Sequence, residues 1–242
     1  MPPGYRRRIL IEPGQNAVTA ELEDDYHRMV VTLTHAEGVV THVTSEMKRS
    51  PWTMCPGAMA QLAHTFTGVP LAGFARRGEK TSNCTHLHDL ALFAAAHAEE
   101  AAPVAYDILV TDAVESVREA SLARDGTPLL HWVLRNAPPN EVFTAPAALA
   151  GTPLTELNGF IAAQDKAMAE AIRILRWASM IAHGRVVDMP AGMSATAFRA
   201  GTCYNFQPGR AETSFRRPGA DIDFSAPGAA PMADREGAFS AS

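Results

Sequence analysis

Alternation of apolar and polar residues predicts a group of strands near the start of the chain. Met29, Val31 and Leu33 occupy every second position, with Val30, Thr32 and Thr34 between them. This period of two is typical of a strand with one buried face. The residues Ala-Glu-Gly at 36–38 then form a turn, and a hairpin partner follows. The strands predicted here are 17–22, 29–34 and 39–43.

A helical period replaces the alternation in the next stretch. Cys55-Pro56-Gly57 opens the first predicted helix, because proline is favoured near the first helical position. Ser82 or Asn83 is predicted to cap the second helix. Apolar residues repeat at i, i+3, i+4 and i+7, which marks the buried face of an amphipathic helix. These faces are Met59, Leu62, Ala63 and Phe66 in the first helix, and Leu87, Leu90, Ala91 and Ala94 in the second.

Strands return after residue 103, and a long helix follows them. The predicted strands are 104–110, 117–123 and 129–134, with an Asp-Gly turn between the last two. After a proline-rich loop at 137–153, apolar residues continue at helical spacing from 155 to 183. The pattern predicts an α+β fold in which N-terminal and central hairpins form an antiparallel sheet. Two short helices and one long helix pack on it, with an extended C-terminal arm.

Composition bounds the domain organisation. The chain has 242 residues, of which 47% are hydrophobic and 19% charged, as in ordinary globular proteins. We expect one α+β domain over 1–200 and an extended packing arm with aromatic anchors over 201–224. From residue 225 to 242 the chain is dominated by Ala, Gly, Pro and Ser, so we expect a disordered tail.

Charge and cysteine content argue against several classes of protein. The net charge of −5 and a pI near 6.0 disfavour nucleic acid as a partner. No run of about 18 apolar residues is present, so no membrane span is expected. Three cysteines, an odd number, disfavour a disulfide framework and suggest a reducing cytoplasm. The glycine-rich motifs of nucleotide sites are also missing.

Two segments place a cysteine at the start of a predicted helix. They are the ten residues from Arg49 to Ala58, which contain Cys55, and the eight from Asn83 to Leu90, which contain Cys84. A helix start favours anions and lowers the pKa of a thiol. His86 falls at the edge of the apolar face and is the candidate base, or a core-edge histidine bonded to a carbonyl. His88 points almost the opposite way and is expected at the surface.

Metal binding is an alternative for the same residues. Cys55, Cys84 and His86, with a carboxylate such as Asp89, could hold zinc or iron. Their spacing matches no standard zinc module. Both cysteines could equally be small buried hydrophobes, or one could be a nucleophile with a histidine base.

Three other features could carry chemistry, each with a structural alternative. Arg49 and Trp52 could clamp an anionic aromatic ligand, or Trp52 could fill the core while Arg49 caps carbonyls. Asp24 and Asp25 with His27 could form a carboxylate–histidine pair, or be solvated at a strand end. Tyr204 could act as a phenolic acid folded over the domain, or simply pack there.

The same strings resemble a bacterial family known as domain of unknown function 2889. The resemblance rests on Arg-x-Pro-Trp-Thr-x-Cys-Pro-Gly-Ala at 49–58 and Asn-Cys-Thr-His-Leu at 83–87. It is supported by Glu-Asp-Asp-x-His at 23–27 and Cys-Tyr-x-Phe-Gln-Pro at 203–208. Together these strings span roughly residues 5–217. Some members are associated with the breakdown of lignin-derived biaryls.

The resemblance implies a cofactor-independent lyase that releases formaldehyde from a phenolic biaryl and leaves a stilbene. It implies no metal and a small aromatic substrate. In that reaction His86 would be the base and Arg49 would face the phenolate. Trp52 and Tyr204 would line an apolar slot for the two aromatic rings. Asp24 and His27 would be a reserve acid–base pair. The residues expected to bind or shape the substrate site are Trp52, Cys55, Asn83, Cys84 and Thr85.

Two other functional classes stay open. One is a metalloenzyme that uses Cys55, Cys84 and His86. The other is a non-enzymatic protein that binds an aromatic ligand. A homodimer is compatible with each, through self-pairing of the long helix at its apolar positions. These positions are Leu157, Ile161, Met168 and Leu175.

Overall fold

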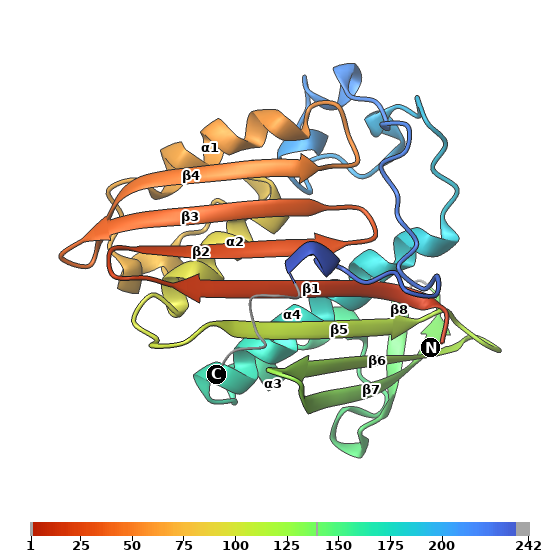
Figure 1. The fold of residues 1–242 in the computed structure, drawn as a ribbon. Helices are drawn as coiled ribbons and strands as arrows, with labels where there is room; N and C mark the ends of the chain where they lie inside the picture. The colour runs from red at the N-terminus through yellow and green to blue at the C-terminus, as the bar shows by residue number, and fades with distance from the viewer. Residues whose placement is uncertain (1, 139, 236–242) are drawn as a thin grey trace. The chain divides into compact units, whose positions relative to one another are not determined.

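A computed structural model describes residues 2–138 and 140–235 (Figure 1). Within them the chain divides into two compact units. The first unit contains residues 9–104 and 189–222. The second contains residues 2–8, 105–188 and 223–235. Strand β1 (Gly4–Pro13) contributes its end to the first unit and its start to the second.

An antiparallel sheet with helices on it builds the first unit. Its strands follow the order β4-β3-β2-β1, and Leu22 pairs with Met29 across a short turn. One face of these strands is apolar and fully buried, as the alternation predicts. Helix α1 packs on β4, and α2 packs on β2 and β3 (Figure 1). The elements are β2 (Ala17–Asp24), β3 (Arg28–Ala36), β4 (Val39–Arg49), η1 (Cys55–Gly57), α1 (Ala58–Phe66), η2 (Leu71–Arg76), η3 (Lys80–Ser82) and α2 (Thr85–Ala96).

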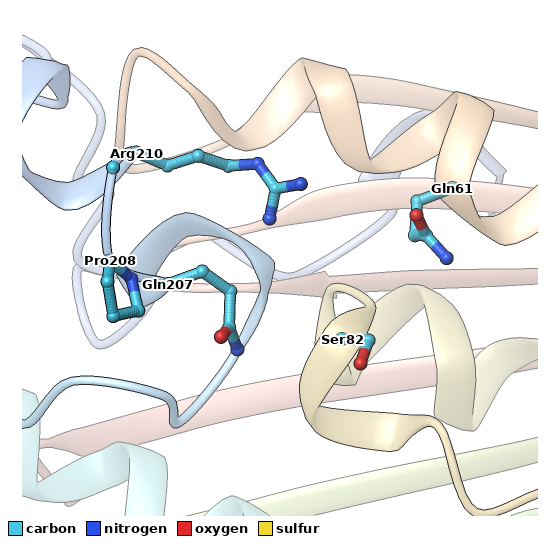
Figure 2. Close-up of a pocket in the computed structure, with 6 residues that line it drawn as sticks. Gln61, Ser82, Gln207, Pro208 and Arg210 are labelled. Atoms are coloured by element: carbon cyan, nitrogen blue, oxygen red, sulfur yellow. The ribbon is translucent and has the colours of Figure 1, made fainter.

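The C-terminal segment of the first unit, residues 189–222, has no long element. It forms the short turns η7 (Ala195–Ala197), η8 (Tyr204–Phe206) and η9 (Ala211–Thr213). An isolated antiparallel β-bridge pairs Arg216 with Trp52. The segment also borders a pocket of about 420 Å³, whose other walls come from α1 and η3 (Figure 2). Residues distant in the chain therefore meet around this segment.

The second unit repeats the combination of antiparallel strands and helices. Its strands follow the order β1-β5-β6-β7-β8, and α4 packs on β6 and β7. The elements are β5 (Val104–Thr111), β6 (Val117–Arg124), β7 (Thr127–Ala137), β8 (Asn140–Ala145), η4 (Ala147–Leu149), η5 (Leu154–Glu156), α3 (Asn158–Ala162), α4 (Lys166–Ala182), η6 (His183–Val186) and η10 (Ala233–Arg235). The predicted α+β class and its antiparallel pairing are confirmed.

The predicted long helix is present as α4, which η6 follows directly, but the expected start near residue 155 is wrong. The helix is interrupted between Ala162 and Lys166, where Asp165 accepts a hydrogen bond from the Met168 N–H at 2.9 Å and caps α4. Of the four positions expected to pair with a second copy, Leu157, Ile161 and Leu175 are buried and Met168 is half-buried. The homodimer stays a prediction.

The predicted division into 1–200, 201–224 and 225–242 likewise stays a prediction. Residues 236–242 of the expected disordered tail lie outside the described residues. Phe224 and Met232, which belong to the second unit, are buried. In the part of the chain that the structure describes, no helix combines the length and apolar character of a membrane span.

Candidate functional site

A buried carboxylate organises the turn between β2 and β3. Asp24 is inaccessible to solvent, and its Oδ1 accepts hydrogen bonds from the backbone N–H groups of Tyr26 and His27, both at 2.8 Å. The same oxygen lies 3.0 Å from Nδ1 of the His27 ring. When His27 Nδ1 carries the proton and donates it to Asp24, Nε2 is left as the acceptor. Asp24 therefore fixes both the turn and the orientation of the imidazole.

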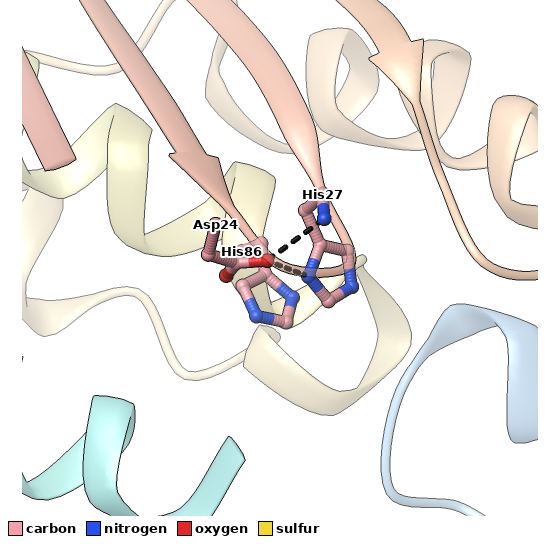
Figure 3. Close-up of side chains that lie close together, drawn as sticks. All are labelled: Asp24, His27 and His86. Carbon is pink, nitrogen blue, oxygen red and sulfur yellow. Dashed lines mark hydrogen bonds and ion pairs between the residues drawn. The ribbon is translucent and has the colours of Figure 1, made fainter. Parts of the chain in front are cut away.

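Helix α2 adds a second imidazole to this pair. The His86 ring stacks on the His27 ring with centroids 3.9 Å apart and an interplanar angle of 30° (Figure 3). Asp24, His27 and His86 are all buried, and each offers a ligand atom within 4.8 Å of the other two. Among the described residues this is the only such group of three His, Cys, Asp or Glu side chains. We call it the Asp24–His27–His86 cluster.

The cluster suits proton transfer because it holds two imidazoles and a carboxylate within 4.8 Å of one another. A neutral imidazole can donate a proton from one ring nitrogen and accept one at the other. Asp24 holds the first ring at its Nδ1, and the second ring lies against the first. Groups able to act as acid and as base therefore lie side by side.

Arg49 holds the turn that carries the cluster. Its guanidinium donates to the carbonyl oxygens of Asp24, Asp25 and His27, and also to that of Ala220. It pairs as well with the Glu23 carboxylate at 3.3 Å. Of the two interpretations of Arg49, the capping of carbonyls matches this geometry. The arginine positions the turn instead of pointing at a ligand.

Trp52 lies in an apolar cluster of the first unit. It is buried with Cys55, and its ring meets Phe198 and Phe206 edge to face at centroid distances of 5.4 and 5.5 Å. The buried Arg216, which sequence reasoning did not single out, lies over the Trp52 ring at 5.6 Å. No sequence pattern marks this arginine. The core interpretation of Trp52 matches these contacts.

The cysteines at the helix starts are buried thiols. Burial raises the pKa of Cys55, and the neighbouring Cys84 and Cys203 raise it further. Burial also raises the pKa of Cys84 to about 12, although the N–H groups of Leu87 and His86 act in the opposite direction. The expected lowering of the thiol pKa by a helix start is therefore wrong, because the loss of solvent outweighs the helix dipole. Neither Cys55 nor Cys84 belongs to the cluster that contains His86.

Tyr204 joins the C-terminal segment to both helix starts. Its backbone N–H donates to the Asn83 carbonyl at 2.9 Å. Its hydroxyl packs so closely on Gly57 that a Cβ there would lie 2.7 Å away. Asn83 is itself buried and donates to Thr65 Oγ1 and to the Glu79 carbonyl. The helix predicted to be capped at Ser82 or Asn83 instead begins after Cys84, and the first helical residue, Thr85, is buried.

Replacing Gly57 with alanine is expected to lower the free energy of unfolding by about 1–2 kcal/mol. Gly57 has φ −63°, which suits alanine, so the cost comes from the contact with Tyr204 and not from the backbone. A double-mutant cycle with Tyr204→Phe, measured by urea unfolding, should recover part of the loss. Equal or greater stability of Gly57→Ala alone would show that Tyr204 does not press on this helix start.

His88 is a second buried histidine on α2. Its expected place at the surface is wrong, since it is 2% exposed and its ring lies 5.2 Å from that of Phe66. Helix α2 contacts β2 and β3, and it also contacts α1 and η2. The side of the helix opposite His86 is therefore covered too.

Comparison with known proteins finds a match to one family model, over part of the chain, and no activity. Residues 12–99 match the model of a family described as a protein of unknown function, DUF2889. The match includes Asp24, His27 and His86, the three members of the cluster, and also Arg49. It ends before Tyr204. No curated protein and no solved structure matches the chain.

Proposed function

We propose that the protein is a lyase that works by proton transfer at the Asp24–His27–His86 cluster. The observation that carries the proposal is the buried Asp24–His27 pair with the His86 ring stacked upon it. Such a set supplies an oriented base and a neighbouring acid without any cofactor. The side chain of His27 is 10% exposed, which leaves an edge for a substrate to reach.

The substrate class of the proposal comes from the resemblance to the DUF2889 family. A phenolic biaryl with a benzylic C–O bond and a hydroxymethyl group on the neighbouring carbon is the proposed substrate. Electrons from its phenolate open the C–O bond and give a quinone methide. The protonated histidine delivers its proton to the departing oxygen.

The second half of the reaction restores the aromatic ring. The neutral histidine takes the proton of the hydroxymethyl group, and the bond from its carbon to the side chain breaks. Formaldehyde leaves, and the electron pair of that bond returns through the new double bond to the phenolate ring. The product is a stilbene. One proton is delivered and one is taken, so the histidines return to their starting charge and no redox partner is needed.

The proposal predicts formaldehyde and stilbene in equal amounts from phenolic lignin dimers. A substrate panel should pair each phenol with its methyl ether, in which no phenolate can form. We expect turnover of at least one phenol and none of its ether, measured by stilbene absorbance and by formaldehyde capture. Equal turnover of phenol and ether would exclude a quinone methide intermediate. Absence of turnover with every compound in the panel would contradict the assignment as a lyase.

A metal-dependent enzyme is the second candidate function. Two histidines and one carboxylate within 4.8 Å of one another are a donor set that zinc or non-haem iron accepts. The ligands would be Asp24, His27 and His86, in place of the Cys55, Cys84 and His86 set considered from the sequence. A bound ion would supply Lewis acidity to the substrate oxygen, and Arg49 would still hold the turn that carries two of the ligands.

A further inference from the structure

The pocket of the first unit has a distinct chemical character. Its volume is about 420 Å³, within the range of small-molecule sites. Four of its lining side chains are polar, and among its lining residues one is cationic and none is anionic. The lining residues are Gln61 from α1, Ser82 from η3, and Gln207, Pro208, Gly209 and Arg210 from the C-terminal segment.

Arg210 is the residue that gives this pocket its charge. Its guanidinium carbon lies 3.9 Å from the centre of the Tyr204 ring. The one hydrogen bond of its guanidinium within the described residues is a long one of 3.4 Å, from Nη1 to the Tyr204 carbonyl. No carboxylate pairs with it there, so most of its five N–H donors remain available.

The setting of Arg210 suits recognition of a planar anion. Stacking on Tyr204 fixes the plane of the guanidinium, and Figure 2 shows this group extending across the pocket toward Gln61. A planar fork of donors matches the two oxygens of a carboxylate. A single cation balances one negative charge, which favours a carboxylate over a phosphate dianion.

The other walls of the pocket offer groups for the rest of a ligand. The Gln207 amide nitrogen is held by the Thr81 carbonyl at 2.8 Å, so its oxygen is presented as an acceptor. The exposed Ser82 supplies a hydroxyl, and Pro208 supplies an apolar edge. A ring with a carboxylate at one end and a hydroxyl at the other would use all of these groups.

We infer that this pocket is a binding site for a small hydroxylated aromatic carboxylate, with Arg210 as its anchor. The inference goes beyond the proposed lyase activity and does not depend on it. Ser82 lies four residues before His86, so the ligand would sit against the segment that leads into the cluster.

Calorimetric titration with 4-hydroxybenzoate tests this inference. Wild-type protein should bind the probe, and Arg210→Gln should weaken binding about tenfold or more through the lost charge-assisted hydrogen bonds. Arg199→Gln is the matched control, because Arg199 is an exposed arginine of the same segment outside the pocket. It should bind as wild type does.

A second variant separates loss of binding from loss of structure. Ser82→Asp places a carboxylate in the pocket at an exposed position, so it should fold normally and weaken 4-hydroxybenzoate binding by a similar factor. Phenol, which lacks the carboxylate, and inorganic phosphate should both bind at least tenfold more weakly than the probe. The inference is overturned if wild type does not bind the probe at millimolar concentration, if phenol or phosphate binds equally well, or if Arg210→Gln and Ser82→Asp leave binding unchanged.

Discussion

Replacement of His27 with glutamine is expected to lower kcat/KM for formaldehyde release by about 10²–10⁴-fold, the range for loss of a positioned acid–base group. Glutamine keeps a side-chain N–H that can donate to Asp24, so the turn should persist. It cannot accept and release a proton as imidazole does. The measurement is steady-state kinetics on the phenolic substrate that wild-type protein turns over best.

The matched control for this variant is His42→Gln. His42 is an exposed histidine on β4 of the same unit, and its replacement should leave kcat/KM within about twofold of wild type. Thermal unfolding of both variants should occur near the wild-type temperature. A folded His27→Gln protein that retains nearly full activity would exclude His27 from the chemistry.

Replacement of Arg49 with methionine is expected to lower the free energy of unfolding by about 3–5 kcal/mol. The Arg49 side chain is 14% exposed, and its removal leaves the carbonyls of Asp24 and His27 without this donor and Glu23 without one of its cations. The melting temperature should fall on the order of 10 °C. Turnover should fall as well, because the same turn orients His27.

The control for the arginine variant is Arg77→Met. The Arg77 guanidinium pairs with the Glu79 carboxylate at 2.7 Å, but both side chains are partly exposed to solvent, as in an ordinary surface ion pair. Its loss should cost less than about 1 kcal/mol. A similarly small loss of unfolding free energy for Arg49→Met would mean that the turn between β2 and β3 does not depend on Arg49.

The elements that pattern could predict are those with a single buried face. Strand β3 alternates along most of its length and β2 does so in its first half, because α2 covers one side of them. Strand β1 gave no such signal, since nearly every residue from Gly4 to Leu10 is buried, Arg6 and Arg7 included. Prediction from a local pattern assumes that charged residues are exposed, and the charged residues buried along this strand contradict that assumption. They depend on partners that the sequence does not reveal.

The break in the long helix has a local cause that periodicity hides. Apolar positions continue at helical spacing on both sides of Asp165, so the pattern favours one helix. Asp165 instead caps a new one. Strand β8 was missed for a similar reason, because Asn140–Ala145 is short and lies within a proline-rich stretch.

The candidate site could be predicted in its parts but not in its assembly. His86 and the Asp24–His27 pair were each recognisable as chemistry-bearing residues, about sixty positions apart. Their stacking requires α2 to pack on the ends of β2 and β3, which is a tertiary contact. Arg49 shows a different case: the sequence left open a ligand clamp and a cap on carbonyls, and the hydrogen bonds of Arg49 to backbone carbonyls match the second.

Formaldehyde release by chelator-treated protein tests the central claim most directly. Protein freed of transition metals should turn over a phenolic lignin dimer at the untreated rate, and added zinc or iron should not raise that rate. This result would support an acid–base lyase at the Asp24–His27–His86 cluster. Loss of activity on chelation, with recovery on addition of zinc or iron, would contradict it and assign the same three side chains to a metal ion.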